Sequence, residues 1–321
     1  MQVKCNVLDR QFQMYQSEYE EAALRVLRSG WYVLGNEVQQ FEEAFAKYTG
    51  RQYCVGLNSG LDALILSVRA LGIGKGDEVI VQANTYIATV LGITENGAPP
   101  VFVEPDEYYN MDADRIEQAI TDRTRAIMVT HLYGQASNMT PIVGIARRHH
   151  LEIIEDCAQS HGACFGGKMT GTFGTAGCFS FYPTKNLGAF GDAGAIVTDD
   201  EAFADKLRMM RNYGSRKKYH NEIEGVNSRL DEMQAALLGV KLAHLRELND
   251  ERRVLAGRYS QGIRNPKIIL PELRDGAESI YHQYVVRCAD RDALQKALDQ
   301  EGIQTQIHYP IPPHLAVCYR H

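Results

Sequence analysis

Short apolar runs alternate with helix-like segments between residues 15 and 240, and this alternation constrains the fold more than any other feature. The runs are rich in Val, Ile, Phe and Tyr and are bounded by Gly, Pro, Asp or Asn, which is typical of buried strands. They cover residues 53–57, 77–83, 99–105, 124–133, 151–156, 178–182 and 193–200. The alternation predicts an α/β fold with a mainly parallel sheet, helices on its faces and ligands at the carboxyl ends of its strands.

Helix signals fill the segments before and between these runs. Residues 15–30 and 37–50 have amphipathic spacing, and each segment closes on a glycine, Gly30 or Gly50. Residues 59–72 and 140–150 are also expected to be helical, the latter with Pro141 suited to a first helical turn.

The pattern changes in the last quarter of the chain. Residues 228–263 predict one long helical segment, interrupted only at Gly239, that links two domains. Strands over 281–290 and 303–310 are expected on either side of a helix over 291–302. With a length of 321 residues, the prediction is a large domain, 1–240, and a smaller α+β domain, 241–321.

Composition excludes several classes of function. A net charge of −6 gives no electrostatic reason to expect nucleic acid or an anionic membrane as partner. No apolar run has the length of a membrane span, and the N-terminus lacks the apolar core of a secretory signal. The seven scattered cysteines form no CxxC pair, so we expect free thiols in the cytoplasm and no metal site.

Lys185 and Asp156 are the most suggestive pair of residues. Lys185 lies in a Gly-rich turn between two predicted strands, where a lysine is a candidate Schiff-base nucleophile. Asp156 ends a predicted buried strand, where a carboxylate can pair with a pyridinium nitrogen. Alone, each has an ordinary explanation as a surface charge or a turn residue. Together they predict pyridoxal 5′-phosphate (PLP) chemistry.

Three residues are candidates for holding the phosphate. Ser59 and Gly60 begin a predicted helix, whose free N–H groups and dipole favour an anion, although a plain helix cap is the alternative. Ser180 alternates with two phenylalanines, so its hydroxyl points away from their rings. Tyr86 follows a strand and can stack on the cofactor ring or belong to the core.

Five motifs in order resemble one family. GLNSGLDAL, EDCAQSHGA, FSFYPTKNLGAFGDAGAIVT, GVNSRLDEMQAA and IHYPIPPHL are similar to those of the DegT/DnrJ/EryC1/StrS sugar-nucleotide aminotransferases and extend over nearly the whole chain. The resemblance implies the PLP-dependent transferase fold type I, as in aspartate aminotransferase. A lysine at position 185 also differs from the similar sugar dehydratases, which have histidine there.

The resemblance implies a role for each matched residue. Lys185 would be the Schiff-base lysine and Asp156 the partner of the ring nitrogen. The remaining cofactor-binding residues would be Gln159 at the ring hydroxyl, Ser59, Gly60 and Ser180 at the phosphate, Tyr86 stacked on the ring, and Asn227 reaching the phosphate from a second chain. An active site shared in this way implies an obligatory homodimer.

Within the family, GVNSRLDEMQAA and HYPIPPHL most resemble the dTDP-3-amino-3,6-dideoxyhexose transaminases. That likeness implies that Tyr182, Lys218, His308 and Tyr309 line the sugar-nucleotide site, with Lys218 at the diphosphate. A solvated charge run is the alternative for Lys218, and a structural role beside the prolines is the alternative for His308.

The expected function is transfer of an amino group from glutamate to C3 of a dTDP-linked 3-keto-6-deoxyhexose, for lipopolysaccharide, another surface glycan or an antibiotic sugar. Alternatives are amination at C4 of a UDP- or GDP-linked 4-keto-6-deoxyhexose and a PLP- or sugar-nucleotide-binding protein without turnover. The resemblance also implies a longer small domain than residues 241–321 provide, so we expect that domain to be incomplete.

Overall fold

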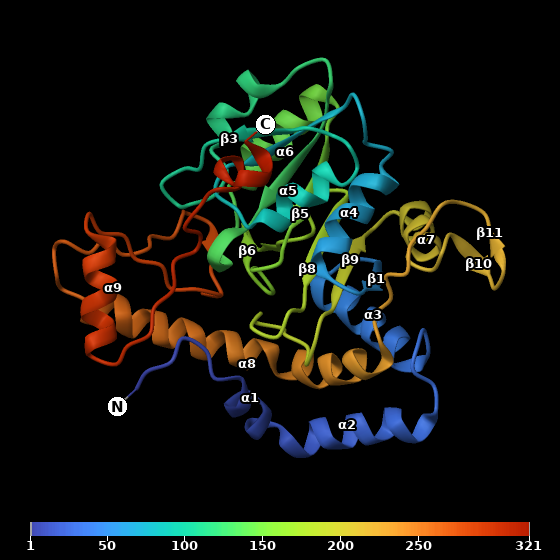
Figure 1. Cartoon of the computed structure of the whole chain (residues 1–321), viewed down its shortest axis with the longest axis horizontal. Helices are drawn as coiled ribbons and strands as arrows, with labels where there is room; N and C mark the ends of the chain where they lie inside the picture. Colours follow the sequence, from blue (N-terminus) through green and yellow to red (C-terminus); the bar gives the residue numbers. More distant parts are fainter. Residues whose placement is uncertain (1, 321) are drawn as a thin grey trace.

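A seven-stranded sheet forms the centre of the computed structural model, which describes residues 2–320 (Figure 1). The strand order is β1-β9-β8-β5-β4-β2-β3. The strands are β1 Tyr53–Leu57, β2 Glu78–Gln82, β3 Pro100–Val103, β4 Thr124–Thr130, β5 Glu152–Asp156, β8 Ala176–Ser180 and β9 Gly194–Thr198. Only β9 runs antiparallel to its neighbours in this sheet. All seven predicted strands and the mainly parallel α/β sheet are confirmed.

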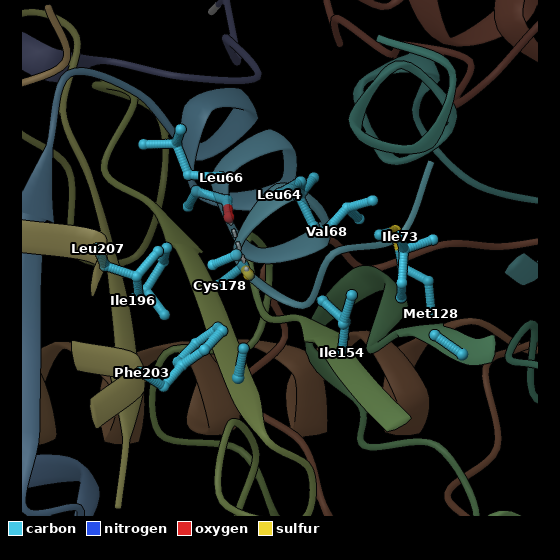
Figure 2. Close-up of a cluster of buried hydrophobic side chains, with 14 of the residues drawn as sticks. Leu64, Leu66, Val68, Ile73, Met128, Ile154, Cys178, Ile196, Phe203 and Leu207 are labelled. Atoms are coloured by element: carbon cyan, nitrogen blue, oxygen red, sulfur yellow. Dashed lines mark hydrogen bonds between the residues drawn. The ribbon is translucent and has the colours of Figure 1, made fainter. Parts of the chain in front are cut away.

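Apolar side chains of the strands alternate between two helix-covered faces. Val79 and Val81 of β2 join the core under α4 Gly60–Ala70 and α7 Glu201–Met210, part of which Figure 2 shows around Leu64, Cys178 and Ile196. Ile80 between them faces the opposite core, under α6 Met139–His149. Because both faces are covered, these strands read as continuous apolar runs in the sequence.

Helices α2 Gln16–Ser29, α3 Asn36–Thr49 and α8 Glu232–Gly262 pack together below the sheet (Figure 1). Gly30 and Gly50 adopt φ angles of 67° and 79°, so both predicted glycine C-caps form. Pro141 lies in the first turn of α6, where its missing N–H costs no hydrogen bond. The short helix α1, Leu8–Met14, was not predicted.

The C-terminal part differs from the prediction in its strands. Helix α9, Arg291–Gln300, forms as expected and Gly302 follows it at φ 75°. The strands predicted over 281–290 and 303–310 are wrong for the described residues, because each segment has only one bridge partner: Ile269 pairs with Arg287 and Val3 with Ile303. A strand needs a neighbouring segment that continues the backbone ladder.

Helix α8 runs without a break through Gly239, contrary to the predicted interruption. The proposed division between residues 240 and 241 falls inside this helix and stays a prediction. The remaining elements are short. They are α5 Ile87–Thr94, β6 Cys164–Phe165, β7 Lys168–Met169, β10 Ser215–Lys217, β11 His220–Asn221, β12 Ala277–Glu278, and the 3-10 helices η1 Ala113–Arg115, η2 Glu117–Ala119, η3 Leu132–Gly134, η4 Pro313–Leu315 and η5 Val317–Tyr319.

The C-terminal residues return to the large sheet beside α6 and β3 (Figure 1). The hydroxyl groups of Tyr319 and Thr94 are hydrogen-bonded at 3.0 Å, which ties η5 to α5. Over residues 2–320, none of the helices combines the length and apolarity that crossing a bilayer requires.

Candidate active site

The carboxyl ends of the parallel strands gather the polar residues predicted to form the site. Asp156 ends β5, and Ser180 ends the adjacent strand β8, five residues before Lys185 in sequence. Strand β1 runs in the same direction as β8, so Ser59 follows its end at the same edge. The fold therefore places these segments where parallel sheets bind ligands.

Asp156 is a buried carboxylate with both oxygens held. The residue is only 5% exposed to solvent. One oxygen, Oδ1, accepts a hydrogen bond from the Ala158 backbone N–H at 3.1 Å. The other, Oδ2, accepts one from the Thr89 hydroxyl at 2.7 Å. Each oxygen keeps further lone-pair capacity, so the carboxylate can accept a proton donor from a ligand.

Lys185 is half-buried near Asp156, in a loop closed by the hydrogen bond from its backbone N–H to the Tyr182 carbonyl at 2.8 Å. Burial lowers the pKa of Lys185 to about 8, and the Asp156 charge opposes this shift. The neutral amine is therefore far more populated at neutral pH than that of a solvated lysine. Burial and the nearby Lys185 charge also lower the pKa of His308.

The residues predicted to hold the phosphate meet at the N-terminus of α4. Ser59 is its N-cap and accepts a hydrogen bond from the Asp62 N–H at 3.0 Å. The backbone of Gly60 lies so close to Ser180 that an added Cβ would be 2.4 Å from the serine Cβ. A Cβ on Gly194 would likewise be 2.3 Å from the Ser59 carbonyl. Glycine at these positions allows the helix N-terminus and two strand ends to converge.

Gln159 connects the sheet edge to the C-terminal segment. Its Nε2 donates to the Tyr309 hydroxyl at 2.9 Å, and its Oε1 accepts from the Tyr133 N–H at 2.7 Å. The Tyr133 hydroxyl donates to the His308 carbonyl. The rings of Tyr86 and Tyr309 lie 5.3 Å apart between centroids. Tyr86, Gln159, His308 and Tyr309 thus lie together beside Asp156 and Lys185.

The other predicted site residues lie at the edge of this group or beyond it. Tyr182 is exposed in the loop before Lys185, whose backbone N–H bonds to the Tyr182 carbonyl. Lys218 lies at the tip of the β10–β11 hairpin, which projects beyond α7 (Figure 1), and its ammonium group is 5.1 Å from the centre of the Tyr219 ring. Asn227 is exposed and pairs with Asn212. The roles of Lys218 and Asn227 stay predictions.

Comparison with known proteins identifies the family. The model of the DegT/DnrJ/EryC1/StrS aminotransferase family matches residues 13–321. The chain belongs to this family. It is 55% identical over 312 residues to a dTDP-3-amino-3,6-dideoxy-alpha-D-galactopyranose transaminase from Aneurinibacillus thermoaerophilus, an alignment covering 97% of this chain and 86% of the relative.

Two solved structures share the fold of this chain. DesV from S. venezuelae, in complex with a ketimine intermediate, matches with a TM-score of 0.98 and 48% identity, covering 99% of this chain and 86% of DesV. NtdA from Bacillus subtilis, with bound cofactor PMP, matches with a TM-score of 0.90 and 32% identity, covering 98% and 74%. The predicted family and fold class are confirmed.

Sequence reasoning missed the buried polar groups behind the aminotransferase site. His161 accompanies Gln159 in the motif EDCAQSHGA, and its Nε2 lies 2.9 Å from the Ser180 carbonyl. Burial and the nearby Lys185 charge lower the pKa of His161 to about 3, so the ring is neutral. Thr89 was also missed. It lies in the apolar segment 87–94, and nothing in the local sequence indicates that its hydroxyl bonds to Asp156.

One buried cluster has the residue types of a metal site, but its histidine nitrogens are already used in hydrogen bonds. His131, Glu155 and Cys157 place their ligand atoms within 4.8 Å of one another. However, His131 Nδ1 accepts a hydrogen bond from the Ser137 N–H at 3.0 Å, and its Nε2 is 2.9 Å from Glu155. Both imidazole nitrogens are therefore engaged within the protein, and the cluster is a hydrogen-bonded support for β5.

Proposed function

We propose that this protein is a PLP-dependent aminotransferase that moves the amino group of glutamate to C3 of a dTDP-linked 3-keto-6-deoxyhexose. The observation that carries the proposal is that half-buried Lys185, whose pKa is lowered to about 8, lies near buried Asp156 at one sheet edge. The transaminase from A. thermoaerophilus, at 55% identity, supports the C3 position and the dTDP-linked sugar. It favours C3 over amination at C4 of a UDP- or GDP-linked sugar.

The residues present fit PLP. The convergence of Gly60 and Ser180 at the N-terminus of α4 offers N–H and hydroxyl donors to a phosphate, and the helix dipole favours its charge. Ser59 would add a hydroxyl, and Gln159 has a second amide hydrogen for the ring hydroxyl. Tyr86 is exposed next to Tyr309 and would stack on the ring.

Lys185 and Asp156 would share the acid–base work. PLP supplies an electron sink for the carbon that loses a proton during amino transfer. Asp156 would hold a proton on the ring nitrogen, because its carboxylate stays oriented by Thr89 and Ala158. Lys185 would anchor PLP through Nζ and later take up and return a proton there, which its lowered pKa favours.

The ketosugar would bind on the solvent side of Lys185. His308 and Tyr309 would contact the hexose, since hydrogen bonds from Tyr133 and Gln159 hold this segment at the site. Tyr182 is exposed at the same loop and would contact the sugar nucleotide. Lys218 would meet the diphosphate, a role that suits a cation on a projecting hairpin.

We infer that the active protein is a homodimer. Trp31 and Tyr32 follow α2 with their side chains exposed, and Tyr86 and Tyr182 are exposed beside the candidate site. Aromatic side chains are enriched in protein–protein interfaces relative to the rest of the surface. Asn227, also exposed, would reach the phosphate of the second chain.

We place the reaction in the cytoplasm, since all seven cysteines carry free thiols.

Spectroscopy during single half-reactions tests this function. The purified protein with PLP should show a visible absorption band that disappears with glutamate and returns with dTDP-3-keto-6-deoxyglucose or its 4-epimer. A UDP-linked 4-keto-6-deoxyhexose should restore the band much more slowly. A band that never responds to glutamate or another amino donor contradicts the aminotransferase proposal and favours a binding protein. Faster recovery with the 4-keto sugar contradicts the C3 assignment.

A further inference from the structure

Thr89 makes the only side-chain hydrogen bond that Asp156 receives among the described residues. The Thr89 hydroxyl donates to Asp156 Oδ2 at 2.7 Å, and the threonine is completely buried. Its backbone N–H bonds to the Tyr86 carbonyl at 3.0 Å in the first turn of α5. One helical turn therefore fixes both the hydroxyl on Asp156 and the aromatic residue proposed to stack on the cofactor ring.

Two more buried hydroxyls continue from Thr89. The Oγ1 atoms of Thr85 and Thr89 are 2.6 Å apart, and those of Thr85 and Thr130 are 3.1 Å apart. A hydroxyl has one hydrogen, and that of Thr89 goes to Asp156. Thr85 must then donate to Thr89, and Thr130 must donate to Thr85. The three hydroxyl hydrogens therefore all point in one direction, from Thr130 through Thr85 and Thr89 toward the Asp156 carboxylate.

The three threonines come from different elements that meet at the sheet edge. Thr130 is the last residue of β4 and pairs in register with Asp156 at the end of β5. Thr85 lies in the loop after β2, and Thr89 lies on α5. All are buried, so bulk water does not compete for these bonds. A donor to an ionised acceptor in such surroundings stabilises its negative charge and fixes its orientation.

We propose that Thr89 is a positioning residue whose hydroxyl donates to the Asp156 carboxylate and holds it aimed at the ring nitrogen of PLP. Thr85 and Thr130 act through Thr89 by fixing the direction in which its hydrogen points. This inference rests on the proposed PLP-dependent function. It adds that Asp156 binds the cofactor ring less tightly when the Thr89 hydroxyl is absent.

Matched substitutions separate the hydroxyl from the packing of the side chain. Thr89→Val keeps the volume and removes the donor, whereas Thr89→Ser keeps the donor and removes a methyl group. Thr49→Val is the control, because Thr49 is also buried but donates to backbone carbonyls of α3. The dissociation constant of PLP is measured by equilibrium dialysis, and unfolding of the PLP-free proteins is measured beside it.

Thr89→Val should weaken PLP binding about tenfold, the lower range for a hydrogen bond to a charged group. Thr89→Ser and Thr49→Val should stay within about twofold of the original protein, and Thr85→Val should lose about threefold. Unchanged PLP binding by Thr89→Val overturns the proposal. So does a loss in Thr89→Ser equal to that in Thr89→Val, which would assign the effect to packing.

A double-mutant cycle tests whether Thr89 acts through Asp156. In the Asp156→Asn background, Thr89→Val should weaken PLP binding less than twofold, because the charge that the hydroxyl serves is gone. An undiminished tenfold loss in that background overturns the proposal. If the unsubstituted protein binds no PLP, the proposed function fails together with this inference. If it binds PLP and only the Thr89 effects are missing, this inference fails alone.

Discussion

Replacing Glu155 by glutamine should destabilise the protein strongly, although Glu155 does not contact the proposed substrate groups. Its carboxylate is completely buried beside Asp156 in β5. It accepts four hydrogen bonds: from His131 Nε2 at 2.9 Å and from the backbone N–H groups of Gly171, Phe173 and Gly174 at 2.7, 2.7 and 2.8 Å. Each carboxylate oxygen accepts two of them.

The size of the effect follows from this pairing. In Glu155→Gln, one oxygen becomes an NH2 group, which cannot accept a hydrogen bond. Whichever way the amide turns, its NH2 group then faces two of the four N–H donors at a position that water does not reach. A hydrogen bond to a charged group contributes roughly 1.5–3 kcal/mol, so the loss of two predicts about 3–6 kcal/mol of unfolding free energy.

Urea unfolding of the PLP-free protein at pH 7 measures this loss. Glu152→Gln is the matched control, because Glu152 lies on the same strand but is exposed and bonds only to Thr175 among the described residues. The control should change the unfolding free energy by less than about 0.5 kcal/mol. A loss of unfolding free energy below about 1 kcal/mol for Glu155→Gln would refute the reasoning. It would mean that the four N–H donors do not need a charged acceptor.

The Glu155 effect should also depend on pH with a definite sign. Burial raises the pKa of Glu155, but the hydrogen bonds from His131 and from the backbone N–H groups of Gly171 and Gly174 outweigh burial and leave the pKa below its ordinary 4.5. A lowered folded-state pKa adds stability above pH 4.5 that is lost as pH falls through the folded-state pKa. The difference between the original protein and Glu155→Gln should therefore narrow below pH 4.5.

Three further predictions concern the site. Asp156→Asn should keep part of the PLP binding but lower the turnover rate by about 100-fold or more. The rate is measured with glutamate and ketosugar, and an unaffected rate would contradict a role of Asp156 in the site. In the PLP-free protein, Lys185 should react with an amine-directed reagent with a midpoint near pH 8, followed by peptide mass spectrometry; a midpoint near its ordinary 10.5 contradicts its lowered pKa. Mixed dimers of Lys185→Ala and Asn227→Ala chains should regain one intact site, and no recovery of activity argues against a shared site.

Local patterns were sufficient to predict the central sheet and its ligand edge. Apolar runs bounded by Gly, Pro or Asp identified all seven strands, because strands buried on both faces carry a strong composition signal. Asp156 and Lys185 were found from their places at strand ends. The strands over 281–290 and 303–310 were overpredicted, because a composition suited to a strand does not supply a pairing partner.

The polar network of the site was harder to predict. The Thr89–Asp156 and Glu155–Gly171 hydrogen bonds join residues that are distant in sequence or lie in irregular loops. Their partners depend on how strands and loops converge, which no local pattern encodes. A buried threonine or glutamate therefore looks ordinary in the sequence, and its role appears only once the sheet edge is assembled.

The central claim is that Lys185 is the residue that carries PLP, and a reductive trap tests it directly. Borohydride added to the PLP-bound protein fixes a pyridoxyl group on the attached amine, and peptide mass spectrometry locates it. Lys241 provides an internal comparison, because it is only 3% exposed and burial lowers its pKa also to about 8. We predict one pyridoxyl group per chain, on Lys185. A label on Lys241 or another lysine, or no label, would contradict the account.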